Sequence, residues 1–309
     1  MFRRAVAADP DDARTLGNFA GFLTRERAAH DEAEALFRRS LALSPESRFV
    51  LHRLAMLLSD VRGAHDEAEA LLRRAVDLDP DDGVSLWRLA FFLTDARRAH
   101  DEAEPLFRRA LAERPDFAPL LSDAANFLTD VRGAHDEAEP MYRRAVAANP
   151  NDPNILGNFA VFLAHRRGDL TAAEALLRRA LADDPDDPNN LANLAQVLFL
   201  AGEDAEARVS LARAVPLADT PALRCEVWFY AHAHAREDHP HALAELRRLV
   251  AAGGRSPGWG LDGDLERARA QGHPDLDLLA TLARVITQDA PPETLEAHAA
   301  WRQAAPSAD

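Results

Sequence analysis

The sequence of 309 residues contains no lysine, so all 36 of its basic residues are arginine. It has a single cysteine, Cys225, which excludes an intramolecular disulfide framework and a cysteine-rich zinc site. No run of about 18 apolar residues occurs, so we expect neither a membrane span nor a signal peptide. These absences predict a cytoplasmic chain without a membrane partner.

Aromatic residues are also scarce. They make up 6% of the chain, although 47% of it is hydrophobic, so alanine and leucine must build the core. Positive charge is in short supply as well, because the formal net charge is −15. Nucleic-acid affinity comes largely from basic side chains that release counterions from phosphates, so we expect no nucleic-acid partner.

What the sequence does contain is a repeat. The string HDEAE, followed by an arginine pair, begins at His30, His65, His100 and His135, with 35 residues from each copy to the next. Arg3 and Arg4 stand one period upstream. A fixed period between about 20 and 50 residues is typical of solenoid proteins.

Each period predicts two antiparallel helices. The first helix carries apolar residues at i, i+3, i+4 and i+7, as between Leu16 and Leu23. The second begins near HDEAE, whose acidic residues suit the positive end of a helix, and buries a stripe that includes Ala33 and Phe37. A proline closes each unit, as at Pro45.

At these positions the units resemble tetratricopeptide repeats, most closely the bacterial and kinesin-light-chain-like variety. The small residue of the family's first helix matches Ala20, Ala55, Ala90, Ala125, Ala160 and Ala195, and the alanine of its second helix matches Ala33, Ala68, Ala103, Ala138, Ala173 and Ala207. The resemblance implies an all-α fold, a right-handed α-solenoid of antiparallel helix pairs with a C-terminal helical cap. Most units exceed the usual length of about 34 residues by one, and we place the extra residue between the two helices.

Pentatricopeptide repeats, which read single-stranded RNA, are similar in period. The acidic charge and the alanines typical of tetratricopeptide repeats disfavour that alternative.

In chain order, we expect a second-helix remnant over residues 1–10, a degenerate seventh helix pair over 220–253 and the helical cap over 254–309. The six repeat units between them are 11–45, 46–80, 81–115, 116–150, 151–185 and 186–219. Because the chain opens in the middle of a repeat, we expect further repeats, a fused partner or self-association at this open end.

The histidines do not predict a metal site. Neighbouring units lie roughly 8–10 Å apart, whereas zinc needs ligand nitrogens about 2 Å away, so the four motif histidines are interpreted as packing residues. A denser cluster, His232, His234, His239 and His241, lacks ligand spacing and is interpreted as a helix end with a polar turn. We predict no metal and no cofactor.

Two nucleophile patterns are weak. Residues 254–258 read GRSPG, which matches the G-x-S-x-G elbow around Ser256. The next residue, Pro257, has no N–H for an oxyanion, and Cys225 is interpreted as a small buried hydrophobe. We predict no enzymatic activity, and a hydrolase that uses Ser256 is the hypothesis to test against this.

The resemblance implies that the first helices line a concave groove that holds a peptide or helix of a partner protein. The candidate groove residues are His52, Arg53, Met56, Trp87, Arg88, Phe91, Asn126, Asn158 and Asn193. Met56, Trp87 and Phe91 lie off the buried stripe and are expected as exposed anchors; the alternative is that Trp87 and Phe91 pack against the next unit.

The asparagines Asn158 and Asn193 occupy a position that bonds the backbone of a bound peptide in many members of the family. The same face is expected to continue through His165, Gln196 and Phe199. The predicted function is therefore a non-enzymatic protein-interaction scaffold. The alternative is a regulatory or sensory subunit, or part of a larger bacterial protein whose catalytic part lies elsewhere.

Overall fold

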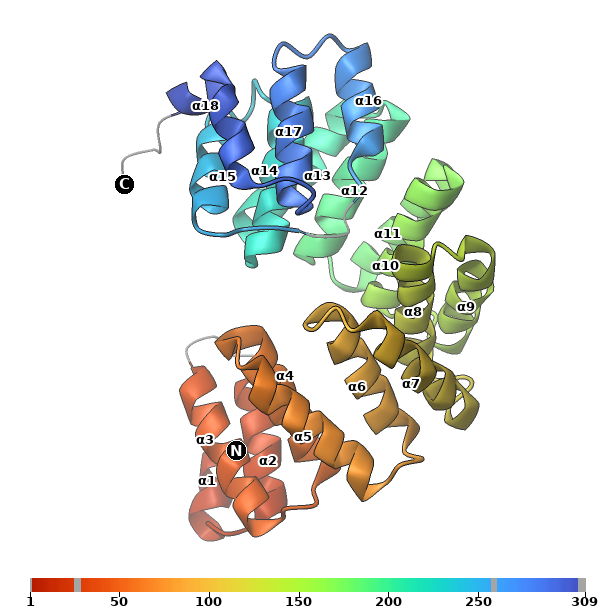
Figure 1. Cartoon of the computed structure of the whole chain (residues 1–309), viewed down its shortest axis with the longest axis vertical. Coiled ribbons are helices and arrows are strands. Elements are labelled where there is room, and N and C mark those ends of the chain that lie inside the picture. The colour runs from red at the N-terminus through yellow and green to blue at the C-terminus, as the bar shows by residue number, and fades with distance from the viewer. Residues whose placement is uncertain (1, 25–28, 257–259, 305–309) are drawn as a thin grey trace. The chain divides into compact units, whose positions relative to one another are not determined.

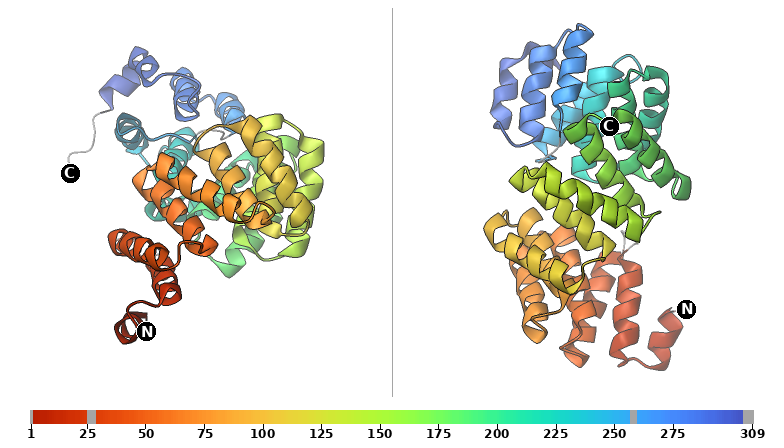
Figure 2. Two further views of the ribbon diagram at one scale, coloured as in Figure 1. Left: turned by 60° about the horizontal axis from the view of Figure 1, so that its bottom comes forward. Right: turned by 90° about the vertical axis from the view of Figure 1, so that its right-hand side faces the viewer.

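The computed structural model describes residues 2–24, 29–256 and 260–304. It divides into two compact units, Met1–Phe127 and Leu128–Asp309, which we call unit 1 and unit 2. Within the described residues the regular structure is helical, without a strand (Figures 1 and 2). The predicted all-α class is thereby confirmed.

The helices follow one another in pairs, such as α2 with α3 and α12 with α13. Unit 1 contains α1 (Phe2–Ala8), α2 (Ala13–Leu23), α3 (His30–Leu43), α4 (Arg48–Leu57), η2 (Leu58–Arg62), α5 (His65–Leu78), α6 (Gly83–Asp95), α7 (His100–Glu113) and α8 (Ala118–Phe127). Unit 2 contains η3 (Leu128–Arg132), α9 (His135–Ala148), α10 (Pro153–Phe162), η4 (Leu163–Arg167), α11 (Leu170–Asp183), α12 (Pro188–Ala201), α13 (Asp204–Leu217), α14 (Pro221–His234), α15 (Ala242–Ala251), α16 (Asp262–Ala270), α17 (Leu276–Ile286), η5 (Pro292–Ala297) and α18 (Ala299–Gln303). The division into repeat units and a cap stays a prediction.

Capping residues explain where the first helices begin. The Asp82 carboxylate accepts from the backbone amides of Val84 and Ser85, which have no partner inside α6. In unit 2, Asp152 caps α10 in the same way, and Pro153 occupies a first-turn position that needs no amide donor.

Small residues let the paired helices approach closely. Alanines at the helix crossings are at most 1% exposed, and a large side chain four residues further along the second helix fills the space beside them. In unit 1 these large side chains include Phe37, Leu72 and Phe107, and in unit 2 they include Tyr142, Leu177 and Leu211, all of them buried. Each such side chain contributes about 1.5–3 kcal/mol on burial.

The extra residue of the longer units lies in a π-helical turn. Elements η2 and η4 continue α4 and α10 with wider turns and end at Gly63 and Gly168, whose φ angles are +63° and +67°. A π turn holds one more residue per hydrogen-bonded ring than an α turn. Helix α12, in the shorter repeat 186–219, has no such turn and ends at Gly202. For these two repeats the predicted position of the extra residue, between the two helices, is wrong, because the residue lies in the π turn that continues the first helix.

The loop after α6 differs, because Arg98 stands where three other repeats have Gly63, Gly133 and Gly168. Its φ of +55° lies in the left-handed region, which costs an L side chain about 1 kcal/mol. We expect Arg98→Gly to raise the free energy of unfolding by about 0.5–1 kcal/mol, measured by urea denaturation. Gly63→Ala is the reciprocal variant, since an added Cβ there meets nothing within 4 Å, and it should destabilise by about 1 kcal/mol. A destabilised Arg98→Gly protein would contradict this.

The HDEAE string and its arginine pair form a ladder of ion pairs between consecutive helix pairs. Arg38 of α3 donates to Glu67 of α5 at 2.5 and 2.9 Å, and Arg97 after α6 reaches back to Glu69 at 2.6 Å. The equivalent contacts are Arg73–Glu102 and Arg178–Glu206 for the first kind and Arg62–Glu34 and Arg167–Glu139 for the second. Exposed pairs contribute at most about 1 kcal/mol each, so the motif mainly builds and spaces the scaffold.

The motif histidines pack on aromatic rings. The His65 ring lies 6.3 Å from Phe92, and His100 lies 6.4 Å from Phe127. In unit 2, His135 lies 6.3 Å from Phe162. For these three histidines the interpretation as packing residues is confirmed.

Candidate functional site

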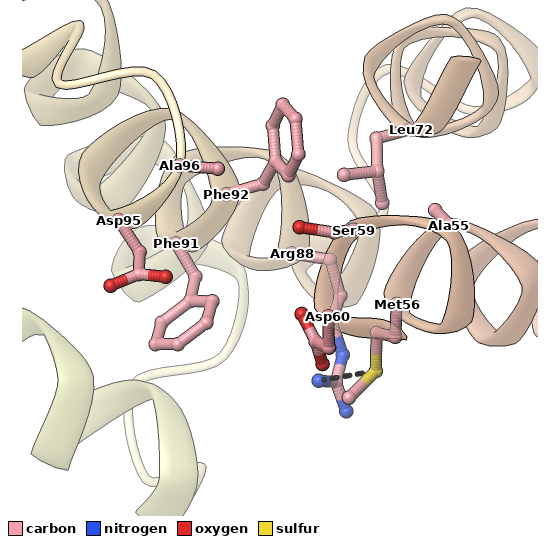
Figure 3. Close-up of a pocket in the computed structure, with 10 residues that line it drawn as sticks. All are labelled: Ala55, Met56, Ser59, Asp60, Leu72, Arg88, Phe91, Phe92, Asp95 and Ala96. Carbon is pink, nitrogen blue, oxygen red and sulfur yellow. Dashed lines mark hydrogen bonds between the residues drawn. The ribbon is translucent and has the colours of Figure 1, made fainter. Parts of the chain in front are cut away.

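The first helices of unit 1 present a mixed apolar and charged surface. We call it the first-helix face of unit 1; α4, η2, α6 and α8 supply its residues Phe49, His52, Arg53, Met56, Asp60, Trp87, Arg88, Phe91, Asp95, Asp123 and Asn126. A small cavity of about 40 Å³ opens in it between η2 and α6, with Met56, Asp60, Arg88, Phe91 and Asp95 in its lining (Figure 3).

Trp87 is not an exposed anchor, so that prediction is wrong. Its side chain is 5% exposed, and its ring meets Phe117 edge-on at 5.2 Å. The indole N–H donates to Asp123 Oδ2 of α8 at 2.9 Å. Burial raises the pKa of Asp123 to about 6, although the indole hydrogen bond and Arg88 oppose the rise. The alternative of packing against the next helix pair therefore holds for Trp87.

Arg88 lies flat against that indole. Its guanidinium carbon is 4.1 Å from the centroid of the Trp87 ring, and Nη1 lies 3.3 Å from Met56 Sδ. Burial and the neighbouring Arg53 lower the pKa of Arg88, and the nearby carboxylates of Asp123 and Asp60 oppose this shift. Among the described residues, no carboxylate lies within ion-pair distance of Arg53 or Arg88, unlike the arginines of the ladder.

Phe91 and Met56 flank this cation. Phe91 is 45% exposed, whereas Met56 is half-buried and lies beside Arg88 (Figure 3). Sequence reasoning missed Phe49, which is 48% exposed one turn before Arg53 and lies 5.7 Å from its guanidinium. Its i, i+4 spacing from Arg53 was the available signal. The surface thus combines unpaired cations with exposed apolar rings.

His52 belongs to a buried polar chain and not to a catalytic triad. His52 Nε2 lies 3.0 Å from Ser85 Oγ, and the Ser85 hydroxyl donates to Asp82 at 2.6 Å. In a triad the carboxylate orients the histidine, and the histidine takes the serine proton; here the serine proton goes to the carboxylate. Burial lowers the pKa of His52 to about 4, so it is neutral at neutral pH.

The three asparagines are half-buried and divided between the units. Asn126 lies on α8 of unit 1, and Asn158 and Asn193 lie on α10 and α12 of unit 2. The role of Asn158 and Asn193 towards a peptide backbone and the place of Asn126 in the groove stay predictions.

Neither nucleophile candidate is suited to attack a substrate, because the Ser256 hydroxyl is hydrogen-bonded and Cys225 is a buried thiol. Ser256 Oγ donates to Glu226 at 2.5 Å, and Pro257 and Gly258 of the elbow pattern lie outside the described residues. Cys225 is buried, and burial raises its pKa to about 11, so it stays a thiol and a poor nucleophile.

The C-terminal histidines do not converge on one point. His232 and His234 lie in the last turn of α14, and His239 and His241 lie in the turn after it, so the interpretation as a helix end with a polar turn is confirmed. Both helix-end histidines are buried: His273 Nε2 donates to the His232 carbonyl at 3.1 Å, and His234 Nε2 lies 2.8 Å from Asp264 Oδ1. Over residues 2–24, 29–256 and 260–304, no group of three or more His, Cys, Asp or Glu side chains could hold a metal ion. The same part of the chain has no helix with the length and apolar character of a membrane span.

Solved structures share this arrangement of paired helices. PilW, a type IV pilus biogenesis factor, is 23% identical with a TM-score of 0.53, covering 68% of this chain and 96% of its own. TTC0263 of Thermus thermophilus, a thermophilic tetratricopeptide repeat protein, is 21% identical with a TM-score of 0.53, covering 60% and 99%. Human IFIT1, in a dimer with m7Gppp-AAAA, is 16% identical with a TM-score of 0.64, covering 94% and 70%. At these identities the likeness shows the fold alone.

Comparison with family models points to the same fold as the solved structures. The search of curated proteins finds no match. Two family models, both described as tetratricopeptide repeat, match residues 96–156 and 164–224 and residues 30–83 and 131–188. Together they span more than half of the chain and coincide with helix pairs whose alanines, large core residues and capping signals follow the family's pattern. The chain belongs to the tetratricopeptide repeat family.

Proposed function

We propose that the first-helix face of unit 1 binds a peptide segment of a partner protein, with an acidic side chain at Arg53 and Arg88 and an apolar side chain against Met56 and Phe91. The family is a type of protein-interaction scaffold, and such proteins are generally not catalytic. The observation that carries the proposal is a pair of neighbouring arginines, set between exposed phenylalanines, that form no ion pair with a carboxylate of the described residues.

At the arginine pair, charge and shape both favour an acidic, apolar segment, and the carboxylates of Asp60, Asp95 and Asp123 on the same face restrict the acidic side chain to this position. Arg53 and Arg88 repel each other, and a carboxylate between them would relieve that repulsion and form charge-assisted hydrogen bonds. Phe49 and Phe91 supply apolar area that is already exposed and costs little to reorganise. Stacking on Trp87 holds the Arg88 guanidinium in place before any ligand arrives.

The test is selection of short random peptides on the whole protein, followed by fluorescence measurement of their affinity. We expect the selected peptides to be enriched in Asp or Glu beside Phe or Leu. Arg53→Gln and Phe91→Ala should each weaken binding about tenfold or more, because each removes a contact worth about 1.5 kcal/mol. Binding should also weaken with salt.

Arg108→Gln is the matched control, because Arg108 is exposed on second helix α7 and pairs with Glu104. It should leave peptide affinity unchanged. Basic peptides in the selection, or full affinity in the Arg53→Gln, Phe91→Ala double variant, would rule out this site. Other points remain predictions. They are a role as a regulatory subunit or part of a larger protein, a cytoplasmic location, and the lack of enzymatic activity and of nucleic-acid and membrane partners.

A further inference from the structure

A buried polar network joins three first-helix segments of unit 2 to one carboxylate of α16. Gln196 of α12 donates its amide N–H groups to Asp264 Oδ2 at 2.7 Å and to the Gly260 carbonyl at 3.1 Å. Its amide oxygen lies 3.0 Å from His165 Nε2 of η4. On the other side of the carboxylate, His234 Nε2 of α14 lies 2.8 Å from Asp264 Oδ1. Side chains from separate helices therefore converge on Asp264.

This network lies where the sequence predicted an open groove. His165, Gln196 and Phe199 were expected to face it, yet Gln196 and Phe199 are at most 1% exposed. Helix α16 packs on α12 and α14, with Asp264 bonded to Gln196 and Arg267 over the Phe199 ring. Figure 1 shows α16 beside α12. The first-helix face of unit 2, here defined by these three residues and His234, is thus occupied by the chain's own α16.

The fit is close along the backbone. A Cβ added to Gly260 would lie 3.2 Å from His165 Nδ1, and one added to Gly263 would lie 3.0 Å from Leu200 Cδ2. Glycine at both places lets the segment before and within the first turn of α16 approach the face. The contact therefore has shape complementarity as well as a hydrogen-bonded anchor.

The contacts that keep α16 on this face are mainly polar, and some of their polar atoms lack a hydrogen-bond partner. Its buried side chains are Asp264 and Ala268, whereas α17 buries six residues, including Leu279 and Ile286. Burial of a carboxylate is costly unless its partners are well satisfied. Two buried atoms of this interface, His234 Nδ1 and Arg267 Nε, have no hydrogen-bond partner in the structure, although Nη2 of the same guanidinium donates to Asp204 of α13. Little apolar burial is a feature of an element that opens locally.

We infer that the first-helix face of unit 2 is a binding surface for a short helix with one carboxylate, and that α16 is its intramolecular occupant. Asp264 is the recognised group, and a small residue one turn later, as at Ala268, allows close approach. A partner helix with Asp or Glu at the equivalent position competes with α16 for the face. The inference does not rest on the proposed function of unit 1, because every residue in it belongs to unit 2.

The test uses the whole chain and a labelled peptide of residues 260–271. Asp264→Asn in the chain weakens the hold on α16, so the peptide should bind this variant about tenfold or more tightly than it binds the wild type. The same peptide with Asp264→Asn should bind neither protein. By hydrogen exchange, the α16 amides of the variant should exchange about tenfold or more faster while those of α14 keep their rates.

A disulfide supplies the control. Leu200→Cys with Gly263→Cys should tie α16 to α12 when oxidised and abolish peptide binding in the Asp264→Asn background, and reduction should restore it. Equal peptide binding to the oxidised and reduced forms would overturn the inference. Exchange of α16 amides together with those of α14 in every variant, or global unfolding of Asp264→Asn without peptide binding, would also overturn it and identify α16 as a fixed part of the fold.

Discussion

Trp87→Ala is expected to lower the free energy of unfolding by about 3–5 kcal/mol, measured by urea denaturation followed by circular dichroism. The indole is buried between α6 and α8, so its removal leaves a cavity beside Phe117. It also leaves the half-buried Asp123 carboxylate without its N–H donor. Both losses act in the same direction.

Two variants separate these contributions. Trp87→Phe keeps most of the ring volume and removes the N–H donor, so it should cost about 1–3 kcal/mol and raise the pKa of Asp123 further above about 6. Phe91→Ala removes a ring that is 45% exposed and should cost about 1 kcal/mol or less. If Trp87→Ala were no more destabilising than Phe91→Ala, the indole would not belong to the core. Trp87 is therefore a poor choice for testing peptide binding, because its loss would damage the fold.

Glu226→Gln is expected to make the stability of the protein less dependent on pH. Burial raises the pKa of Glu226 to about 7, with the Ser256 hydroxyl opposing the rise. A carboxyl whose pKa is raised on folding stabilises the fold fully below its unfolded pKa and loses this contribution as the pH rises through the folded value. Between about pH 4.5 and 7, wild type should lose on the order of 3 kcal/mol through this group.

Urea denaturation of both proteins at pH 5 and pH 8 measures this effect. Glutamine keeps an acceptor for Ser256 but does not ionise, so the variant should match wild type at pH 5 and exceed it by about 2–3 kcal/mol at pH 8. Glu237→Gln, on an exposed residue of the same unit, is the control and should behave like wild type at both values. A constant difference between Glu226→Gln and wild type at the two pH values would show that Glu226 is not protonated in the fold.

Short-range patterns in the sequence predicted most of the scaffold. Apolar spacing along each helix, alanines at the crossings and Asp-Pro caps act within one or two turns, so they could be read without knowledge of the neighbours. The HDEAE string likewise predicted the start of four second helices, α3, α5, α7 and α9. The π turns were missed because an insertion of one residue has the same length in a loop as in a helix.

Position on a helix did not predict exposure. Trp87 and Phe91 both lie off the buried stripe, yet α8 covers one ring and leaves the other 45% exposed. The Asp123 carboxylate that receives the indole N–H is 36 residues away in the sequence. Gln196 and Phe199 were expected to be exposed but are covered by α16, again because the covering helix lies far away in the sequence.

The sequence by itself determined the helix pairs, their order and the buried stripe, because these depend on periodicity within each repeat. Only the tertiary structure decided which first-helix side chains stay open. That exposure depends on helices one or more repeats away, since α8 covers Trp87 and α16 covers Gln196. The charge of each arginine likewise depends on whether a carboxylate forms an ion pair with it. No carboxylate of the described residues forms an ion pair with Arg53 or Arg88, although Asp60 and Asp123 lie near Arg88. The fold thus makes these two arginines the positively charged part of the candidate site in unit 1.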